Sequence, residues 1–240
     1  MICANILSSY RSDCLPNCPA FTHTYEVVDV PEQEQVDAFI PYRDFSNRMD
    51  LDEPMSTCIT AGPDWNTEFR YQQHLAILNA AKRIDEIDAQ FGARFGRTYG
   101  GMVEAYRCED AEAVMVTLGS VAGTTRIVVD ALRGQGHKVG MLRLRCLRPF
   151  PIREVIAALG RVKAVGVLEK DIDFGYEGTV LTNVNSALAR MDHAPRTQNF
   201  IAGLGGRAIS KKDIEDMFME LLSGKPEQTV EFVKLRCVEA

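Results

Sequence analysis

The chain has 240 residues, with 27 lysines and arginines against 33 aspartates and glutamates, which gives a formal net charge of −6. Proteins that bind nucleic acid or anionic membranes need a basic face, so this balance argues against both classes. No apolar run approaches the roughly 20 residues of a transmembrane helix, and the first ten residues lack the pattern of a signal peptide. We therefore expect a cytoplasmic protein that binds neither nucleic acid nor membrane.

The seven cysteines are odd in number and widely scattered, unlike the even disulfide framework of a small secreted domain. We expect reduced thiols. Cys14 and Cys18 in "CLPNC" lie within reach of one metal ion, but structural zinc needs four ligands and an iron–sulfur cluster needs further thiolates. Cys3 and His23 are the nearby residues that would complete such a site, and unpaired thiols are the interpretation that we prefer.

Residues 1–66 have the composition of an irregular arm, because Pro, Asp, Asn and Ser interrupt every periodic apolar run. One short helix is expected to begin near Pro31, where a proline and acidic residues stand together. From residue 67 to about residue 95, apolar residues recur every three or four positions until Gly92 and Gly96 end the pattern. This spacing predicts one long amphipathic helix, and residues 67–106 form this helix and a connector.

From residue 107 onward, apolar strands alternate with helical patterns. We expect strands at 113–118, 139–144, 164–168 and 199–201, and helices at 121–134, 152–159, 179–190 and 211–222. Strands that are apolar on both faces and joined by helices indicate a parallel sheet covered on both sides. The predicted fold class is therefore α/β, with a three-layer, mostly parallel open sheet in residues 107–240. Ser210 and Asp213 are spaced as a capping box for the last helix.

The stretch "TLGSVAGTT" at 117–125 joins the first of these strands to its helix. Free backbone N–H groups and the positive end of a helix dipole meet at such a turn, and many phosphate sites begin this way. The turn lacks both the dinucleotide pattern G-x-G-x-x-G and the P-loop pattern. In the structural alternative, Gly119 bends the chain, Ser120 caps the helix, and Gly123 lets the helix lie close to the sheet.

Ligands of an open parallel sheet bind outside the carboxyl ends of its strands. The candidate anion-binding residues at this edge are Gly119, Ser120, Arg145, Arg148 and Arg207. In the alternative that we prefer, the arginines pair with Glu169, with Asp171 or with a neighbouring subunit. No spacing of serine, histidine and acidic residues marks a catalytic triad or a metal motif, so we assign no catalytic and no metal-binding residue.

Four segments stand in one order along the chain: "FTHTYEVVDVPEQEQVDAFIP", "TEFRYQQHLAILNAAKRIDEIDAQFGARFGRTYGGMVEAYRCEDAEAVMVTLGSVAGTTR", "GMLRLRCLRPFP" and "NFIAGLGGRAIS". Together they resemble the later part of the α subunit of 2-oxoacid:ferredoxin oxidoreductases, the pyruvate synthase group. The resemblance covers about residues 21–222, whereas residues 1–20 depart from the family. It implies that the α/β part is similar to the C-terminal domain of transketolase.

In that family the enzyme decarboxylates a 2-oxoacid on thiamine diphosphate, passes electrons through [4Fe–4S] clusters to ferredoxin, and transfers the acyl group to coenzyme A. The resemblance implies as partners a thiamine-binding β subunit, a γ subunit and a ferredoxin-like δ subunit, with a homodimer of this chain as a further option. The pyrimidine-binding domain lies upstream of the matched part, and the cluster cysteines belong to other subunits or domains. We therefore expect this chain to bind no cofactor itself and to be inactive alone.

Two candidate functions follow from the residues and from the resemblance. The first is a non-catalytic structural and assembly domain of a thiamine-diphosphate-dependent oxidoreductase of the pyruvate type. The alternative is a freestanding binder of a phosphorylated ligand, coenzyme A or a nucleotide, at the carboxyl edge of the sheet. The residues do not identify the 2-oxoacid.

Overall fold

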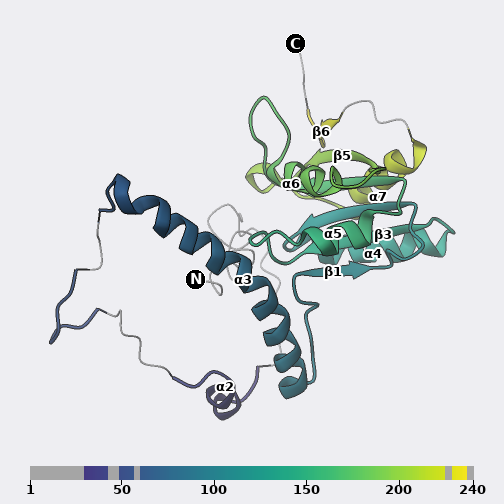
Figure 1. The fold of residues 1–240 in the computed structure, drawn as a ribbon. Helices are drawn as coiled ribbons and strands as arrows, with labels where there is room; N and C mark the ends of the chain where they lie inside the picture. Colours follow the sequence, from purple (N-terminus) through teal and green to yellow (C-terminus); the bar gives the residue numbers. More distant parts are fainter. Residues whose placement is uncertain (1–29, 43–48, 57–59, 225–228, 237–240) are drawn as a thin grey trace. The chain divides into compact units, whose positions relative to one another are not determined.

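The structure is a computed structural model that describes residues 30–42, 49–56, 60–224 and 229–236 (Figure 1). The chain divides into two compact units, one formed by Thr24–Tyr99 and one that contains Gly100–Ala240. Within the described ranges, no helix has the length and apolar character that crossing a membrane requires. Cys3, Cys14, Cys18 and His23, the residues considered for a metal site, lie outside these ranges.

The described residues of the unit Thr24–Tyr99 form two helices, α2 (Gln33–Phe39) and α3 (Pro63–Phe95). Both were expected, and α3 is confirmed as one long helix. It begins four residues earlier than its apolar spacing indicates, because Pro63 occupies the first helical position, where a proline costs no hydrogen bond. It ends at Gly96, whose φ of 72° is the left-handed conformation that suits a glycine after a helix.

Aromatic rings join α2 to the last part of α3. The ring of Phe39 on α2 lies 5.8 Å from that of Phe91 and 5.5 Å from that of Phe95, both with edge-to-face geometry. Phe91 also contacts Tyr99, with ring centroids 5.8 Å apart. Such aromatic pairs stabilise beyond the area that they bury, so this cluster accounts for the position of the short helix α2 on α3.

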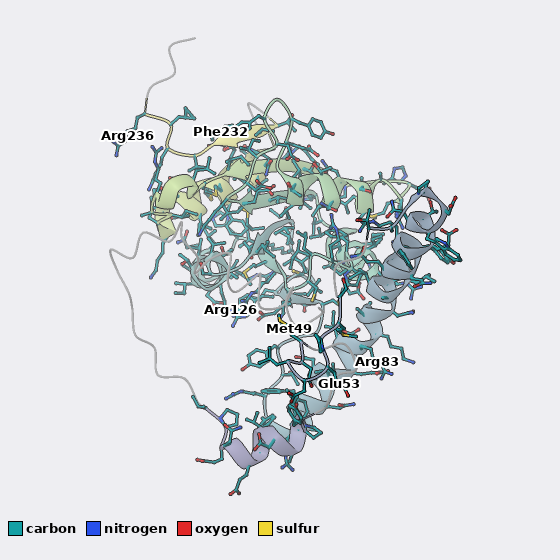
Figure 2. All side chains as sticks on the ribbon, turned by 90° about the vertical axis from the view of Figure 1, so that its left-hand side faces the viewer. Met49, Glu53, Arg83, Arg126, Phe232 and Arg236 are labelled. Carbon is teal, nitrogen blue, oxygen red and sulfur yellow. The ribbon has the colours of Figure 1, made fainter. Side chains whose placement is uncertain are left out.

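The first part of α3 keeps large apolar side chains exposed. Trp65 is 63% exposed and Tyr71 is 61% exposed, and Leu78, which belongs to the predicted apolar stripe, is 51% exposed. Ile84 of the same stripe is buried. Polar residues such as Arg83, labelled in Figure 2, pair within the helix, with 2.9 Å between Arg83 Nη1 and Glu86 Oε2. The predicted helix is confirmed, but several of its large apolar side chains stay exposed in the part of the chain that the structure describes.

The other unit is the predicted α/β part. In chain order it comprises β1 (Val103–Tyr106), β2 (Ala113–Leu118), α4 (Val121–Gly134), β3 (Val139–Leu144), α5 (Ile152–Leu159), β4 (Ala164–Glu169), α6 (Thr179–Leu188), β5 (Arg196–Ile201), the 3-10 turn η1 (Leu204–Gly206), α7 (Lys211–Ser223) and β6 (Val230–Phe232). The strand order is β1-β3-β2-β4-β5-β6. β1 pairs antiparallel with β3, and the other neighbouring strands pair in parallel.

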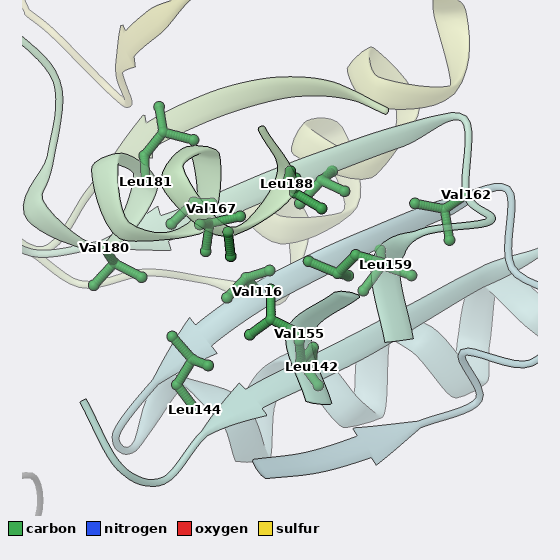
Figure 3. Close-up of a cluster of buried hydrophobic side chains, with 14 of the residues drawn as sticks. Val116, Leu142, Leu144, Val155, Leu159, Val162, Val167, Val180, Leu181 and Leu188 are labelled. Carbon is green, nitrogen blue, oxygen red and sulfur yellow. The ribbon is translucent and has the colours of Figure 1, made fainter. Parts of the chain in front are cut away.

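Two apolar clusters cover the two faces of this sheet. Val116 and Leu142 face one cluster, together with Leu159 of α5 and Leu181 of α6 (Figure 3). Met115, next to Val116 on the same strand, faces the other cluster, together with Phe218 of α7. Because neighbouring strand residues point to opposite faces, fully apolar strands need helices on both sides. The three-layer, mostly parallel open sheet is confirmed.

The sequence pattern missed β1 and β6 and misplaced some ends of the elements. β1 is a four-residue edge strand and β6 has three residues, both too short to show a clear period. β5 begins at Arg196, three residues before the predicted start, because its first residues are polar. The capping box of α7 is confirmed: Asp213 N donates to Ser210 Oγ at 3.3 Å, and Ser210 N donates to Asp213 Oδ2 at 2.6 Å.

Candidate functional site

The carboxyl ends of four parallel strands lie at one edge of the sheet. β2, β3, β4 and β5 end there at Leu118, Leu144, Glu169 and Ile201. From β2 the chain first adds β3 on one side and then crosses to add β4 on the other side. Open α/β sheets bind ligands where the strand order reverses in this way, so a ligand site is expected at this edge.

The turn between β2 and α4 is a structural turn with two features that differ from the prediction. Gly119 bends the chain as expected, with a φ of 81°. Ser120 occupies the N-cap position, but the predicted cap is wrong: its backbone is helical, with φ −70°, and its side chain makes no capping hydrogen bond. The prediction for Gly123 is also wrong, because an added Cβ would meet no atom within 4 Å. Gly123 is exposed, so it does not serve a close approach of α4 to the sheet.

The three arginines of the candidate anion site bind backbone carbonyl groups. Arg145 Nη1 donates to Gly101 O at 3.1 Å, and Arg148 Nη1 donates to the neighbouring Leu147 O at 2.7 Å. Arg207 Nη1 donates to Lys234 O at 2.6 Å. Arg145 and Arg207 thus join segments that are 44 and 27 residues apart in the sequence, whereas the Arg148 bond is local.

The five candidate residues spread along the edge of the sheet. Gly119 and Ser120 follow β2, Arg145 follows β3, and Arg207 comes after β5. β2 and β4 lie between β3 and β5, which are about 14 Å apart at the usual strand spacing of about 4.8 Å. The strand order does not favour one anion held by Arg145 and Arg207 together.

A buried carboxylate lies at the same edge, at the end of β4. Glu169 is 5% exposed. Its Oε2 accepts from Val180 N at 2.8 Å, and its Oε1 accepts from Leu181 N at 3.1 Å, both in the first turn of α6. The expectation that an arginine pairs with Glu169 is wrong, because this carboxylate instead caps α6. A negative charge at this position also meets the positive end of the helix dipole.

Asn199 of β5 completes the attachment of α6. Its Nδ2 donates to Glu169 Oε1 at 2.8 Å and to Val167 O at 3.2 Å, while its Oδ1 accepts from Gly178 N at 2.7 Å. Gly178 is required there, because an added Cβ would lie 2.2 Å from Glu169 Oε1. We call Glu169, Gly178 and Asn199 the carboxylate clamp.

Two opposing effects set the acidity of Glu169. Burial raises the pKa of Glu169, because removing the carboxylate from water disfavours its charged form. Hydrogen bonds from Val180, Asn199 and Leu181 lower this pKa, and the nearby charge of Asp171 raises it again. The net result is a raised pKa, so the clamp holds a carboxylate whose charge is only partly compensated.

The loop between β4 and α6 forms a closed turn next to this clamp. Tyr176 N donates to Asp173 O at 2.8 Å, and Asp173 N donates to Glu177 O at 3.2 Å. Gly175, at the third position of the turn 173–176, has a φ of 84°, which glycine adopts most readily. Phe174 and Tyr176 project outward and are 96% and 67% exposed. We call residues 173–176 the aromatic turn.

Sequence reasoning missed the carboxylate clamp. In the sequence, Asn199 belongs to a predicted apolar strand. It lies 30 positions from Glu169, so no local pattern indicates that the two side chains meet. The weak signals were an acidic residue at the end of an apolar strand and a glycine directly before a helix. An arginine was also an expected partner of Asp171. In the structure, Asp171 Oδ2 accepts a hydrogen bond from Thr179 Oγ1 at 2.6 Å.

Two cysteines are within the described ranges. Cys108 and Cys146 are buried, and neither forms a disulfide within the described part of the chain. Burial raises the pKa of Cys108 to about 11, and its Sγ contacts Met141 O at 3.2 Å. A thiol with so high a pKa is a poor nucleophile at neutral pH. Among the described residues, no group of three or more His, Cys, Asp or Glu side chains is placed to hold a metal ion.

Residues 111–214 match the family model "Pyruvate:ferredoxin oxidoreductase core domain II". The chain is 40% identical over 215 residues to the pyruvate synthase subunit PorA of Methanothermobacter thermautotrophicus. This alignment covers 90% of this chain and 54% of the relative. It is 38% identical over 220 residues to the ketoisovalerate oxidoreductase subunit VorA of Pyrococcus abyssi, with 90% of this chain and 56% of that relative. The chain thus spans about half the length of these relatives.

Two solved structures show weaker likeness. A 2-oxoglutarate:ferredoxin oxidoreductase from Magnetococcus marinus matches with a TM-score of 0.39 and 21% identity, over 55% of this chain and 21% of that one. A split-gene transketolase matches with a TM-score of 0.38 and 15% identity, over 48% of this chain and 39% of that one. We therefore base the relationship on the sequence relatives alone.

Proposed function

The chain belongs to the family of 2-oxoacid:ferredoxin oxidoreductase subunits that includes PorA and VorA, and from this we propose that it is a structural and assembly part of such an enzyme. The observation that carries the proposal is the similarity at 40% identity over 90% of the chain. In this proposal the chain is non-catalytic and holds neighbouring subunits in position.

Exposed apolar residues on α3 support an assembly role. Trp65 and Phe69 are 63% and 48% exposed, and they share one face of α3 because they stand four residues apart. Large apolar side chains that stay exposed side by side are typical of sites that contact another protein. We propose that α3 packs on a partner subunit through Trp65 and Phe69.

The cofactors belong to the whole complex in this proposal. Thiamine diphosphate would be bound by a β subunit, [4Fe–4S] clusters by a ferredoxin-like δ subunit, and coenzyme A by the assembled enzyme, with a γ subunit completing it. Ferredoxin would reach the complex through those subunits, and two copies of the whole assembly would form a dimer. We place this enzyme in the cytoplasm.

The substrate class in this proposal is a 2-oxoacid. The relatives are named for pyruvate and for ketoisovalerate at similar identity, 40% and 38%. This chain's residues do not separate the two, since we place the substrate contacts in other subunits.

Reconstitution tests the proposal. The chain is produced together with the other subunits of one 2-oxoacid:ferredoxin oxidoreductase from its own source, and the tagged chain is purified. We expect the subunits to copurify in fixed ratio and to reduce ferredoxin when a 2-oxoacid and coenzyme A are supplied, whereas the chain alone is inactive. Full activity of the remaining subunits without the chain would contradict an assembly role.

Calorimetric titration tests the rival function of a freestanding binder. Thiamine diphosphate, coenzyme A and nucleotides are titrated separately into the purified chain, and we expect no saturable heat. Arg145 and Arg207 already bind backbone carbonyls, so a phosphate group would have to break those hydrogen bonds. Tight binding that Arg207→Ala abolishes would contradict the structural role.

A further inference from the structure

The aromatic turn presents the most exposed aromatic side chain among the described residues of the α/β unit. Phe174 is 96% exposed and its neighbour Tyr176 is 67% exposed. A phenylalanine or tyrosine buries about 150–250 Å² when it is covered, so leaving both in water forgoes a large stabilisation. Among the described residues, neither side chain belongs to the two apolar clusters that cover the sheet.

The turn is held in one shape before any partner arrives. Hydrogen bonds close it from Tyr176 N to Asp173 O at 2.8 Å and from Asp173 N to Glu177 O at 3.2 Å. The residue that follows the turn is attached to α6, because Asn185 Nδ2 donates to the Glu177 carboxylate at 3.2 and 3.3 Å. A preformed loop loses little conformational freedom on binding, which favours affinity.

The surroundings of the turn are acidic. Residues 169–177 contain Glu169, Asp171, Asp173 and Glu177 against the one lysine, Lys170. Asp171 and Asp173 are exposed beside Phe174. A surface that covers Phe174 must therefore offer an apolar pocket, and complementary charge requires lysine or arginine at its rim.

We propose that the aromatic turn is a docking element that inserts Phe174 into an apolar pocket, bordered by lysine and arginine, on another subunit of the oxidoreductase. The inference rests on the proposed function, because that function supplies the partner. Phe174 is the anchor, Tyr176 covers its flank, and the acidic residues steer the approach. The carboxylate clamp holds the turn on the sheet at the ends of β4 and β5.

The test measures the affinity of the full chain for the complex of the remaining subunits. Phe174→Ala removes the anchor, and Phe232→Ala is the matched control: Phe232 is an exposed phenylalanine of the same unit, on the edge strand β6 (Figure 2). We expect Phe174→Ala to raise the Kd by about 30-fold, which is the scale of an interface hot spot. Phe232→Ala should change it by less than about threefold.

Charge is tested separately with Asp173→Asn. This change keeps the backbone N–H that closes the turn and removes one exposed acidic group. We expect slower association at low salt and a weaker dependence of the association rate on salt concentration, with little change in the dissociation rate. Unchanged association kinetics across the salt series would overturn the basic rim of the pocket.

The outcomes separate this inference from the proposed function. If the wild-type chain assembles and Phe174→Ala assembles with the same Kd, the docking element is overturned and the assembly role stands. If the wild-type chain does not assemble, the assembly role and the docking element are both overturned. Self-association of the chain that Phe174→Ala abolishes, with assembly unchanged, would assign the turn to a second copy and likewise overturn the proposal. Urea unfolding of each variant checks that the fold is intact.

Discussion

Two helices of the α/β unit follow neighbouring parallel strands, α4 after β2 and α6 after β4, and their first turns are stabilised differently. Ser120 stands at the start of α4 without a capping hydrogen bond, directly after Gly119. The first turn of α6 is bound by Glu169 and Asn199, which come from two strands. A glycine stands near the start of both helices, so glycine alone did not indicate which helix start is held by hydrogen bonds from side chains. The distinguishing feature was a buried carboxylate that accepts hydrogen bonds from the helix.

The largest expected difference between the two turns comes from adding a methyl group. Gly178→Ala places a Cβ 2.2 Å from Glu169 Oε1, so the carboxylate clamp must open. We expect the free energy of unfolding to fall by about 2–3 kcal/mol. The matched control is Gly123→Ala in α4, where an added Cβ meets nothing within 4 Å. It should raise the free energy of unfolding by up to about 1 kcal/mol, because alanine favours helix.

Urea denaturation of the two variants checks this prediction. A loss of stability in Gly123→Ala equal to that in Gly178→Ala would contradict the difference between the turns.

The second expected difference comes from removing the capping groups themselves. Glu169→Gln keeps the shape of the side chain, but its NH₂ group faces backbone donors of α6 and one acceptor is lost. We expect the free energy of unfolding at neutral pH to fall by about 1–2 kcal/mol. Thermal unfolding compares this variant with Gly123→Ala, and a loss of stability in Glu169→Gln no larger than that in Gly123→Ala would contradict the capping role of Glu169.

The smallest expected effect is a pH dependence of the free energy of unfolding, which comes from Glu169 at the start of α6. Burial raises the pKa of Glu169 in the folded chain above its value in the unfolded chain. Between the two values the folded chain binds more protons, so its free energy of unfolding falls as pH rises through this window. The free energy of unfolding of the wild-type chain should therefore exceed that of Glu169→Gln by a smaller amount as pH rises through this window. Parallel stability curves for the two proteins from acidic to neutral pH would show that Glu169 is not responsible.

Local patterns predicted most of the fold because they reflect local physics. Strands β2 and β3 and helices α4 and α5 begin and end at the predicted residues. The strands are short continuous apolar runs and the helices short periodic ones, and turn residues bound both. The Ser210 and Asp213 cap was also predictable, because its hydrogen bonds span three residues. The family was recognisable from four segments in order.

The carboxylate clamp was not predictable in the same way. It joins Glu169, Gly178 and Asn199 through the parallel pairing of β4 and β5, and the Cα partners Val167 and Asn199 show that register. The roles of these three residues become apparent only when that register is known. For the same reason Arg145 and Arg207 looked like one site in the sequence, whereas strand order places two strands between their positions.

The attachment of α6 also affects how the α/β unit opens. The first N–H groups of a helix have no partner within the helix and usually exchange their hydrogens with water readily. Here the amides of Val180 and Leu181 bind a carboxylate from β4, and the amide of Gly178 binds a side chain from β5. These hydrogens can exchange with deuterium only when α6 leaves both strands. The beginning of α6 should therefore exchange as slowly as the centre of the sheet, and α6, β4 and β5 should open as one cooperative unit.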